Sequence, residues 1–376
     1  MNLPIKFWLV LFFLPFTGSG QSLHKVEAEK RLFTQIDKYI QAQIDTAKES
    51  PVPGISIAIV KGKELIHLKG FGVANIKTKQ PLKSDNTFHV ASVTKTFTAT
   101  SILQLIERKK LRLDEKLTHY LPYFSMADKR YRDITIRQVL NHTSGMPDVE
   151  EYEWEKAVAD KGAAERWTRS LTNQTLLATP GTAYHYSNMA YDVLADVVAK
   201  VTGKPFEQYV KETILQPLQM VRSSLLLPEV SSSWRTSPHT GIPLKVNSVY
   251  PYNRMHSASG TLNTNVIDLS HWMIANLNEG VYKTSRILSA ASIALMQTPT
   301  FQIDSSSRQA IGLSWFIYPY RGVNLVNHDG RDDGYVSVLC LIPSRQLGFV
   351  ILCNSDEADS YTMKNEVLNM LLSSDI

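Results

Sequence analysis

The stretch Phe88-His89-Val90-Ala91-Ser92-Val93-Thr94-Lys95 places a serine three residues before a lysine in a largely apolar segment. Apolar spacing predicts one helix from Ser92 to about Lys109, with a stripe of Val93, Phe97, Ile102, Leu105 and Ile106. Residues three apart share a helix face, so the hydroxyl and the amine can meet. A desolvated lysine can take the proton that makes a serine hydroxyl nucleophilic. At the helix start, free backbone N–H groups favour the negative charge that develops.

Ser-x-x-Lys is a short pattern, and the chain holds a second copy at Ser22–Lys25. Taken alone, either copy is more often a solvated helix face than a catalytic pair. Further motifs elsewhere in the chain are needed to distinguish a catalytic pair from a solvated helix face.

Composition restricts the functional classes. The chain has 376 residues, of which 43% are hydrophobic and 20% charged, which is typical of a globular protein with a large core. The net charge of +5 is modest, and no Lys/Arg block or basic-aromatic stripe occurs, so nucleic acid is not an expected partner. The ten histidines are scattered, without His-Glu-x-x-His or Cys-x-x-Cys, so neither a metal nor another cofactor is expected.

The N-terminus differs in kind from the rest. Lys6 precedes an apolar run over 7–16, and small residues follow before Gln21. This pattern predicts a cleaved secretory signal over 1–20 and a mature domain over 21–376 that is secreted or periplasmic. The run is too short to span a bilayer comfortably, so no stable membrane span is expected after cleavage; an uncleaved anchor is the alternative.

The two cysteines, Cys340 and Cys353, lie in apolar runs joined by a turn over 343–348. This arrangement predicts a β-hairpin. A symmetric turn places Cys340 opposite Ile351, so two buried free thiols are expected in preference to a disulfide.

Periodicity along the chain predicts an α+β fold in which an antiparallel sheet is flanked by helices. The sheet part takes about 25–112 and 256–376, and a mostly helical insert takes about 113–255. Helices are expected over 25–48, 135–141, 150–170, 189–202, 205–214, 265–278, 289–297 and 364–372, and strands over 55–60, 64–71, 312–318, 323–327, 335–342 and 349–353. Residues 227–255 lack periodicity and hold four prolines, which predicts a loop overhanging a site, with His239, Tyr250 and Tyr252 as possible substrate contacts.

Two further motifs raise the weight of the first. Tyr186-Ser187-Asn188 places a phenol and an amide at the start of a predicted helix. Asn327-His328-Asp329-Gly330 follows a predicted strand, with a glycine where backbone can approach a ligand. A third stretch, His142-Thr143-Ser144-Gly145, is a turn after a helix, and His142 is interpreted as a locally hydrogen-bonded turn residue.

The chain resembles class C β-lactamases and the DD-peptidases and esterases that share their fold. The motifs of that family are Ser-x-x-Lys, Tyr-x-Asn, and Lys-Thr-Gly or His-x-Gly. Ser92–Lys95, Tyr186–Asn188 and His328–Gly330 match them in order, and the similarity runs over about 30–355. The resemblance implies the β-lactamase/transpeptidase-like fold, in which the sheet carries an inserted helical subdomain.

Acyl transfer in two steps is the chemistry that this resemblance implies. Ser92 attacks a carbonyl, while Lys95 and Tyr186 share the task of taking its proton and delivering one to the leaving group. The sequence does not decide which of the two is the base. Asn188 orients the lysine and the substrate, and His328 holds the tyrosine by hydrogen bond or charge.

The same resemblance assigns the oxyanion site to the backbone N–H groups of Ser92 and Arg331. Gly330 and Asp329 then contact the substrate. Asp329 stands where a hydroxyl residue is common, and it would repel the carboxylate of a β-lactam unless its side chain turns away or Arg331 compensates.

His328 in place of the lysine, together with Asp329, favours a peptidase-like or esterase-like member over an efficient β-lactamase. The expected function is hydrolysis of amides or peptides, such as D-amino-acid peptides. The expected partner is therefore a small-molecule or peptide substrate. A carboxylesterase on the same site and a slowly deacylating penicillin-binding sensor are the alternatives. The sequence makes no prediction of oligomeric state.

Overall fold

The computed structural model describes residues 18–45, 49–156 and 158–374. The predicted signal segment lies outside these ranges except for its last three residues, which begin helix α1. Within the described residues, no helix combines the length and the apolar character that crossing a bilayer requires.

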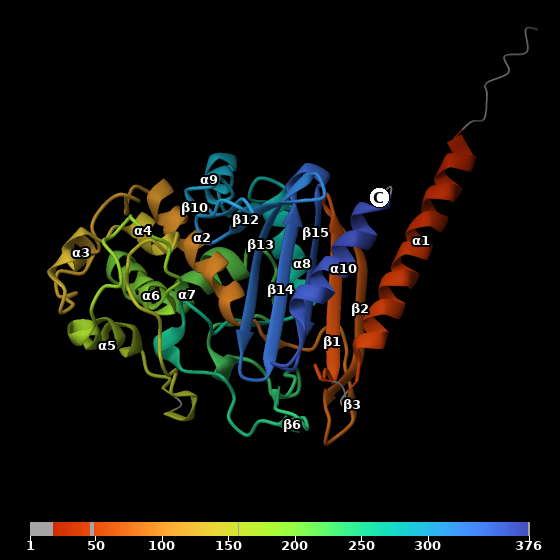
Figure 1. The fold of residues 1–376 in the computed structure, drawn as a ribbon, viewed down its shortest axis with the longest axis horizontal. Coiled ribbons are helices and arrows are strands. Elements are labelled where there is room, and N and C mark those ends of the chain that lie inside the picture. Colours follow the sequence, from red (N-terminus) through yellow and green to blue (C-terminus); the bar gives the residue numbers. More distant parts are fainter. Residues whose placement is uncertain (1–17, 46–48, 157, 375–376) are drawn as a thin grey trace, which may run out of the picture.

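A nine-stranded antiparallel sheet forms the frame of the molecule (Figure 1). Its order is β10-β11-β12-β13-β14-β15-β1-β2-β3, so strands from the two ends of the chain meet where β15 pairs with β1. The strands are β1 Gly54–Lys61, β2 Glu64–Asn75, β3 Gln80–Pro81, β10 Phe301–Asp304, β11 Gln309–Ile311, β12 Phe316–Tyr320, β13 Val323–Asp332, β14 Tyr335–Ile342 and β15 Leu347–Cys353.

Helices cover both faces of this sheet. Helices α1 Gly18–Gln43 and α10 Ser360–Leu372 pack on one face, against alternate residues of β1 and β14 such as Ile57 and Val338. Helix α8 Val266–Leu277 packs on the other face, where the neighbouring residues Ala58 and Leu339 point. The alternation of side chains along a strand thus divides the core into two layers.

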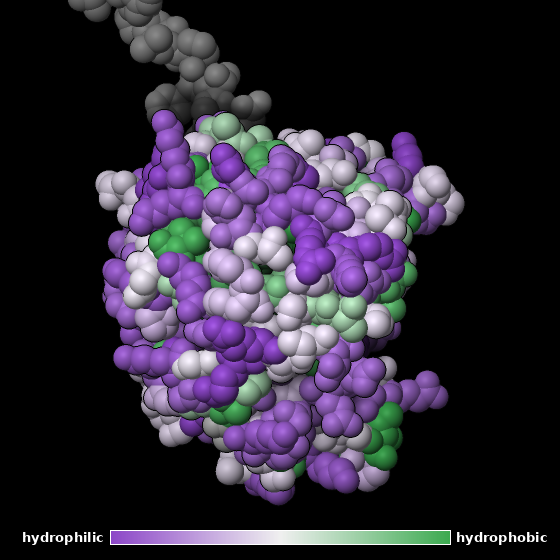
Figure 2. Space-filling model, turned by 90° about the vertical axis from the view of Figure 1, so that its left-hand side faces the viewer, coloured by the Kyte–Doolittle hydropathy of each residue, from purple (hydrophilic) through white to green (hydrophobic). Residues whose placement is uncertain are grey.

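The remaining helices gather at one end of the sheet, to the left in Figure 1. They are α2 Thr94–Glu107, α3 Leu117–Tyr120, α4 Ile136–Leu140, α5 Ala163–Ser170, α6 Asn188–Thr202, α7 Phe206–Val210 with a π-helical turn Lys211–Leu215, and α9 Ala290–Met296. Short strand pairs lie outside this sheet: β4 Phe88–His89 with β7 Asn263–Thr264, β5 His239–Thr240 with β6 Lys245–Val246, and β8 Val281–Tyr282 with β9 Ser285–Arg286. The β4–β7 pair joins segments that are far apart in the chain. The helical end is mainly hydrophilic, with scattered hydrophobic residues (Figure 2).

Helix α2 lies at the centre of the fold. All residues from Thr94 to Leu105 are buried, so the helix is enclosed all round, whereas the sequence predicted a stripe on one face. The ring of Phe97 stacks on Trp272 of α8, with centroids 3.9 Å apart. This contact joins the Ser-x-x-Lys helix to the layer that supports the sheet.

Most predicted elements are confirmed, with their local signals. Ser187 caps α6 by accepting from the N–H of Ala190, and Gly203 ends that helix at φ +72°. Asn265 caps α8 in the same way. The helix predicted over 150–170 is wrong in its first half, where the structure has only the 3₁₀ turn Trp154–Lys156 before α5.

The register of the C-terminal hairpin differs from the prediction. Ile342 pairs with Leu347, so Cys340 lies opposite Phe349 and not Ile351. The turn is shorter than the symmetric six-residue turn because Gln346 takes a left-handed conformation at φ +51°. Both cysteines are buried and free, as expected. The division between sheet part and helical insert stays a prediction.

We predict that Phe97→Ala lowers the free energy of unfolding by about 3–5 kcal/mol, because a fully buried ring leaves a cavity between α2 and α8. Urea denaturation followed by circular dichroism measures this change. Leu177→Ala is the control: its side chain is 60% exposed, and we expect a change within about 0.5 kcal/mol. Equal effects of the two substitutions would contradict the central position of α2.

Candidate active site

Ser92 lies in the 3₁₀ turn Ala91–Val93 that leads directly into α2. Ala91 has φ +46°, a left-handed conformation that L-residues rarely adopt. Lys95, one turn further, donates from Nζ to Ser92 Oγ at 2.9 Å. The hydroxyl and the amine of the first motif therefore meet, next to a strained residue of the kind that clusters at functional sites.

The amine of Lys95 is buried completely. Its Nζ lies 5.1 Å from the ring centroid of Tyr186 and 5.6 Å from that of Tyr191. Burial lowers the pKa of Lys95 to about 8, although the carboxylates of Asp192, Asp332 and Asp148 act in the opposite direction. The neutral amine, which can accept a proton, is therefore accessible near neutral pH.

Tyr186 of the second motif stands beside this pair. Its ring stacks on His142 with centroids 4.2 Å apart, and the Lys95 amine lies 5.1 Å from its centroid. Burial raises the pKa of Tyr186 well above its ordinary value. The phenol therefore keeps its proton at neutral pH.

His142 does more than hydrogen-bond locally in its turn. Its Nδ1 accepts from the backbone N–H of Ser187 at 3.1 Å, which fixes the imidazole against the Tyr186 ring. Burial, and then the charge of Lys95, lower the pKa of His142 well below its ordinary value, so the ring is neutral. It acts as a support for the tyrosine.

Asn188 has a partner that the sequence did not indicate. Its backbone N–H and its side-chain Nδ2 donate to the carboxylate of Asp148, at 2.7 and 3.2 Å. In the described part of the chain, the hydrogen bonds of Lys95 Nζ go instead to Ser92 and to the carbonyl of Ser259. The predicted orientation of the lysine by Asn188 is thus replaced by a different contact.

His328 of the third motif lies within β13, not after a strand as predicted. Its Nδ1 donates to the carbonyl of Asp329 at 2.8 Å, so its buried Nε2 carries a lone pair, and it has no partner among the described residues. Burial, and then the charge of Lys95, lower the pKa of His328 to about 3. At neutral pH it carries no charge with which to hold Tyr186.

Gly330 marks the point where β13 touches the serine turn. A Cβ at this position would lie 2.5 Å from the carbonyl oxygen of Val90 and 2.9 Å from the backbone nitrogen of Ser92. No larger residue fits without moving one backbone, so the glycine allows β13 to approach the Ser92 N–H. The assignment of the Ser92 and Arg331 N–H groups to an oxyanion site stays a prediction.

Asp329 and Arg331 point to the opposite face of the sheet. Their register partners are Val338 and Val336, which belong to the layer under α10. Asp329 forms an ion pair with Lys364 of α10, and the Arg331 guanidinium donates to the carbonyl of Ala358 at 2.9 Å. The Asp329 side chain therefore turns away from Ser92, which removes the expected repulsion of an anion at the serine.

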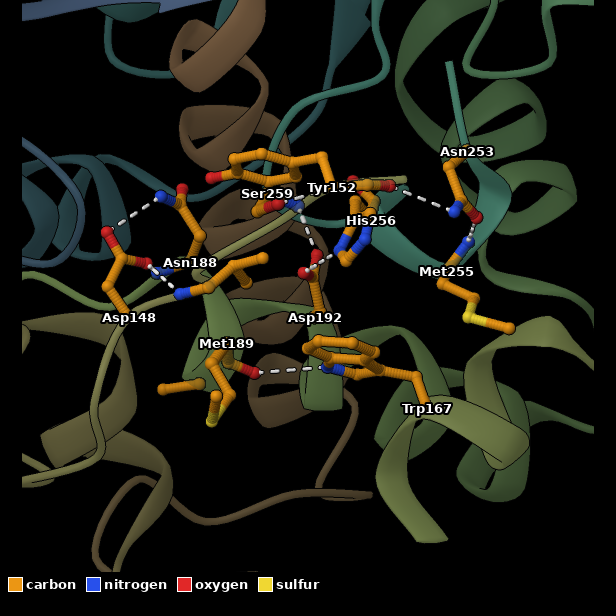
Figure 3. A network of polar contacts seen from close by, with 12 residues as sticks. Asp148, Tyr152, Trp167, Asn188, Met189, Asp192, Asn253, Met255, His256 and Ser259 are labelled. Atoms are coloured by element: carbon orange, nitrogen blue, oxygen red, sulfur yellow. Dashed lines mark hydrogen bonds and ion pairs between the residues drawn. The ribbon is translucent and has the colours of Figure 1, made fainter. Parts of the chain in front are cut away.

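A network of polar contacts next to the motif residues joins Ser259, Asp192 and His256 (Figure 3). The carbonyl of Ser259 accepts from Lys95 Nζ at 2.8 Å, and the N–H of Ser259 donates to Asp192 at 3.1 Å. Asp192 also bonds His256 Nδ1 at 2.7 Å. This buried aspartate lies four residues after Asn188 on α6, a spacing visible in the sequence, whereas no sequence signal pointed to Ser259.

The loop over 227–255 does not deliver the expected substrate contacts. Both ring nitrogens of His239 bond to backbone, at Asn354 and Ile76, and the hydroxyl of Tyr250 bonds Asn263. Tyr252 is 5% exposed. These three side chains serve packing.

Across the described ranges, no group of three or more His, Cys, Asp or Glu side chains is placed to hold a metal ion.

Comparison with known proteins agrees with this geometry. A family model described as Beta-lactamase matches residues 34–371. The chain is similar to protein flp of Staphylococcus aureus strain N315, with 29% identity over 329 residues covering 85% of this chain. It spans only 62% of the length of that relative. It is also similar to penicillin-binding protein 4 of Amycolatopsis lactamdurans, with 29% identity covering 83% of this chain and 84% of that protein.

Two solved structures share the architecture. The octameric penicillin-binding protein homologue from Pyrococcus abyssi superimposes with a TM-score of 0.79 at 25% identity, covering 91% of this chain and 78% of that one. The β-lactamase/D-alanine carboxypeptidase from Pseudomonas syringae gives 0.76 at 19% identity, covering 93% and 99%. The expected β-lactamase/transpeptidase-like fold is thereby confirmed.

We predict that Asp192→Asn changes the pH dependence of the rate of Ser92 acylation. The acidic limb of this profile, where the rate rises with pH, moves to lower pH by about 0.5–1 unit. Asparagine keeps an oxygen for the Ser259 N–H but removes a charge that raises the pKa of Lys95, so this pKa falls. The rate of labelling by a fluorophosphonate, measured from pH 5 to 10, reports the limb. Asp196→Asn, one turn further along α6 and bonded to Tyr123, is the matched control and leaves the limb in place. An unchanged or upward shift in Asp192→Asn would contradict the assignment.

Proposed function

Because this chain belongs to the beta-lactamase family, we propose that it is a serine hydrolase that forms an acyl-enzyme at Ser92 and cleaves amide or peptide bonds. The observation that carries this proposal is the contact of Ser92 Oγ with a fully buried amine, 2.9 Å away. A serine with only solvent around it has no base to activate it.

In the proposed mechanism, Lys95 is the base. With a pKa of about 8, about one lysine in ten is neutral at pH 7, whereas Tyr186 holds its proton far more tightly. The neutral Lys95 amine takes the proton of the Ser92 hydroxyl while Ser92 Oγ attacks the carbonyl carbon of the substrate. Tyr186, whose ring lies 5.1 Å from the Lys95 amine, then passes a proton to the leaving nitrogen and is reprotonated from Lys95. Water repeats the attack and releases the acid.

The oxyanion of each tetrahedral intermediate is assigned to the backbone N–H groups of Ser92 and Arg331. The close approach that Gly330 permits supports this assignment. Backbone donors need no reorganisation when charge develops, and each is typically worth about 3 kcal/mol. Asn188, fixed by Asp148, is assigned to the substrate side of the cleft.

The proposed substrates are D-amino-acid peptides or related amides. The names of two similar proteins, a penicillin-binding protein and a β-lactamase/D-alanine carboxypeptidase, support this class. Efficient β-lactamase activity is not proposed, because the neutral His328 supplies no charge for a drug's carboxylate. The signal-like pattern over 1–20 supports a secreted or periplasmic location.

We predict that a fluorophosphonate labels Ser92 and no other residue, as read by peptide mass spectrometry. Ser92→Ala abolishes labelling, and Lys95→Met and Tyr186→Phe each slow it by about 10²–10⁴-fold, because proton transfer is lost. Ser22→Ala, in the other Ser-x-x-Lys sequence, leaves the rate unchanged. Label that persists in Ser92→Ala would place the nucleophile elsewhere.

We further expect penicillin to form an adduct on Ser92 that decays with time in intact-mass spectra, since the water step has its base in place. Turnover of D-peptides with the same enzyme then supports the hydrolase. A persistent adduct would instead favour the slowly deacylating sensor. Turnover of p-nitrophenyl esters without peptides would favour the carboxylesterase.

A further inference from the structure

A cavity opens beside the catalytic cluster, on the side of the sheet that α10 covers. Its volume is about 570 Å³. It begins at Tyr186 and His328, where β13 extends beyond its pairing with β12, and reaches the first turns of α10. The lining residues are Tyr186, Ser307, Gln309, Phe316, Tyr318, Pro319, Tyr320, Asn327, His328, Asp329, Tyr361, Lys364 and Asn365.

The walls of this cavity are largely aromatic. Phe316, Tyr318 and Tyr320 alternate along β12, and so lie on one face of the strand. Tyr186 closes the inner end, and Tyr361, which is 72% exposed, stands at the rim. Such walls fit an aromatic or alkyl stem.

The buried polar side-chain atoms of the cavity that have no partner among the described residues are all acceptors. They are Asn327 Oδ1, His328 Nε2 and Asp329 Oδ1, which are buried and make no hydrogen bond with any described residue. His328 Nε2 belongs to this set because Nδ1 of the same neutral ring carries the proton that the Asp329 carbonyl accepts. Buried polar groups are rarely left unpaired, so the cavity calls for a ligand that brings donors.

The positive charge of Lys364, which lines the cavity, is neutralised by the carboxylate of Asp329. Lys364 Nζ forms its ion pair with Asp329 Oδ2 and lies 5.9 Å from the ring of Tyr318. The side chain of Lys364 is 7% exposed and that of Asp329 34%, so the ion pair is sheltered from solvent mainly on the lysine side. A carboxylate entering here would meet three acceptors and a lysine whose charge is neutralised.

We infer that this cavity is a subsite for a substrate arm that ends in an N–H donor, an ammonium or a primary amide, on an aromatic or alkyl stem. Asn327 Oδ1 and Asp329 Oδ1, on the α10 face of β13, bind the donors. The aromatic walls bind the stem, with an added attraction for a cation. The subsite selects against an arm that ends in a carboxylate. That the arm belongs to a substrate of Ser92 rests on the proposed function.

Binding of three small probes tests the subsite without catalysis. The probes 3-phenylpropylamine, 3-phenylpropanamide and 3-phenylpropanoate share one carbon skeleton and differ in the terminal group. Calorimetry at pH 7 on the full chain is expected to give a Kd at least tenfold lower for the amine or the amide than for the propanoate. Failure of all probes to bind, or a propanoate that binds equally or more tightly, overturns the inference.

Two substitutions in the ion pair sharpen the test. Asp329→Asn leaves the Lys364 ammonium uncompensated and is expected to reverse the order, so that the propanoate binds at least tenfold more tightly than the amine. Lys364→Met frees the Asp329 carboxylate and is expected to strengthen the preference for the amine. Lys200→Met removes an ion pair with Glu165 outside the cavity and is the matched control, which keeps the wild-type order. An unchanged order in both cavity variants overturns the inference.

Fluorophosphonate labelling of the same samples keeps the two proposals apart. It reports whether each variant is folded and whether Ser92 is reactive, while calorimetry reports the cavity. Loss of labelling at Ser92 in the wild-type chain refutes the proposed function and leaves the binding result standing. Normal labelling with no selectivity among the probes refutes the subsite alone.

Discussion

The exclusion of water from the amine of Lys95 is the constraint on which the rest of the site depends. An ammonium in contact with solvent holds its proton at neutral pH, whereas a buried one releases it more easily. Helix α2 achieves this by being buried all round, with Tyr186 and Tyr191 over the amine and Ser259 behind it. The packing of α2 in the core therefore affects reactivity, because it excludes water from the Lys95 amine and so lowers the pKa of this group.

The two faces of β13 make different contacts, one with the serine turn and the other with α10. His328 and Gly330 face the serine turn, where the glycine lets two backbones meet and the neutral histidine adds no charge. Asp329 and Arg331, the alternate residues, face α10 and bind Lys364 and Ala358. A strand places neighbouring residues on opposite sides, so one motif serves both the catalytic cluster and the cavity under α10. This alternation explains how an aspartate is tolerated within the third motif.

The sequence predicted the fold and the three motifs well, because each rests on local signals. Helix caps such as Ser187 and Asn265, and the apolar runs of β1 and β14, are properties of short segments. The failures concern what short segments do not contain. The register of the Cys340 hairpin depended on Gln346, a left-handed residue in the turn. The helix predicted over 150–170 begins only at Ala163. Ser259 and Asp148 reach the site only through tertiary contact, and the neutrality of His328 follows from burial, which no motif reports.

Titration of Lys95 itself by nuclear magnetic resonance tests the central claim most directly. The chain is labelled with ¹³C at lysine Cε, and the Lys95 signal is assigned by its loss in Lys95→Arg. We expect a midpoint near pH 8, well below the ordinary lysine value of 10.5. A midpoint at 10 or above would show that the amine is solvated and protonated, and so would contradict its role as the base for Ser92.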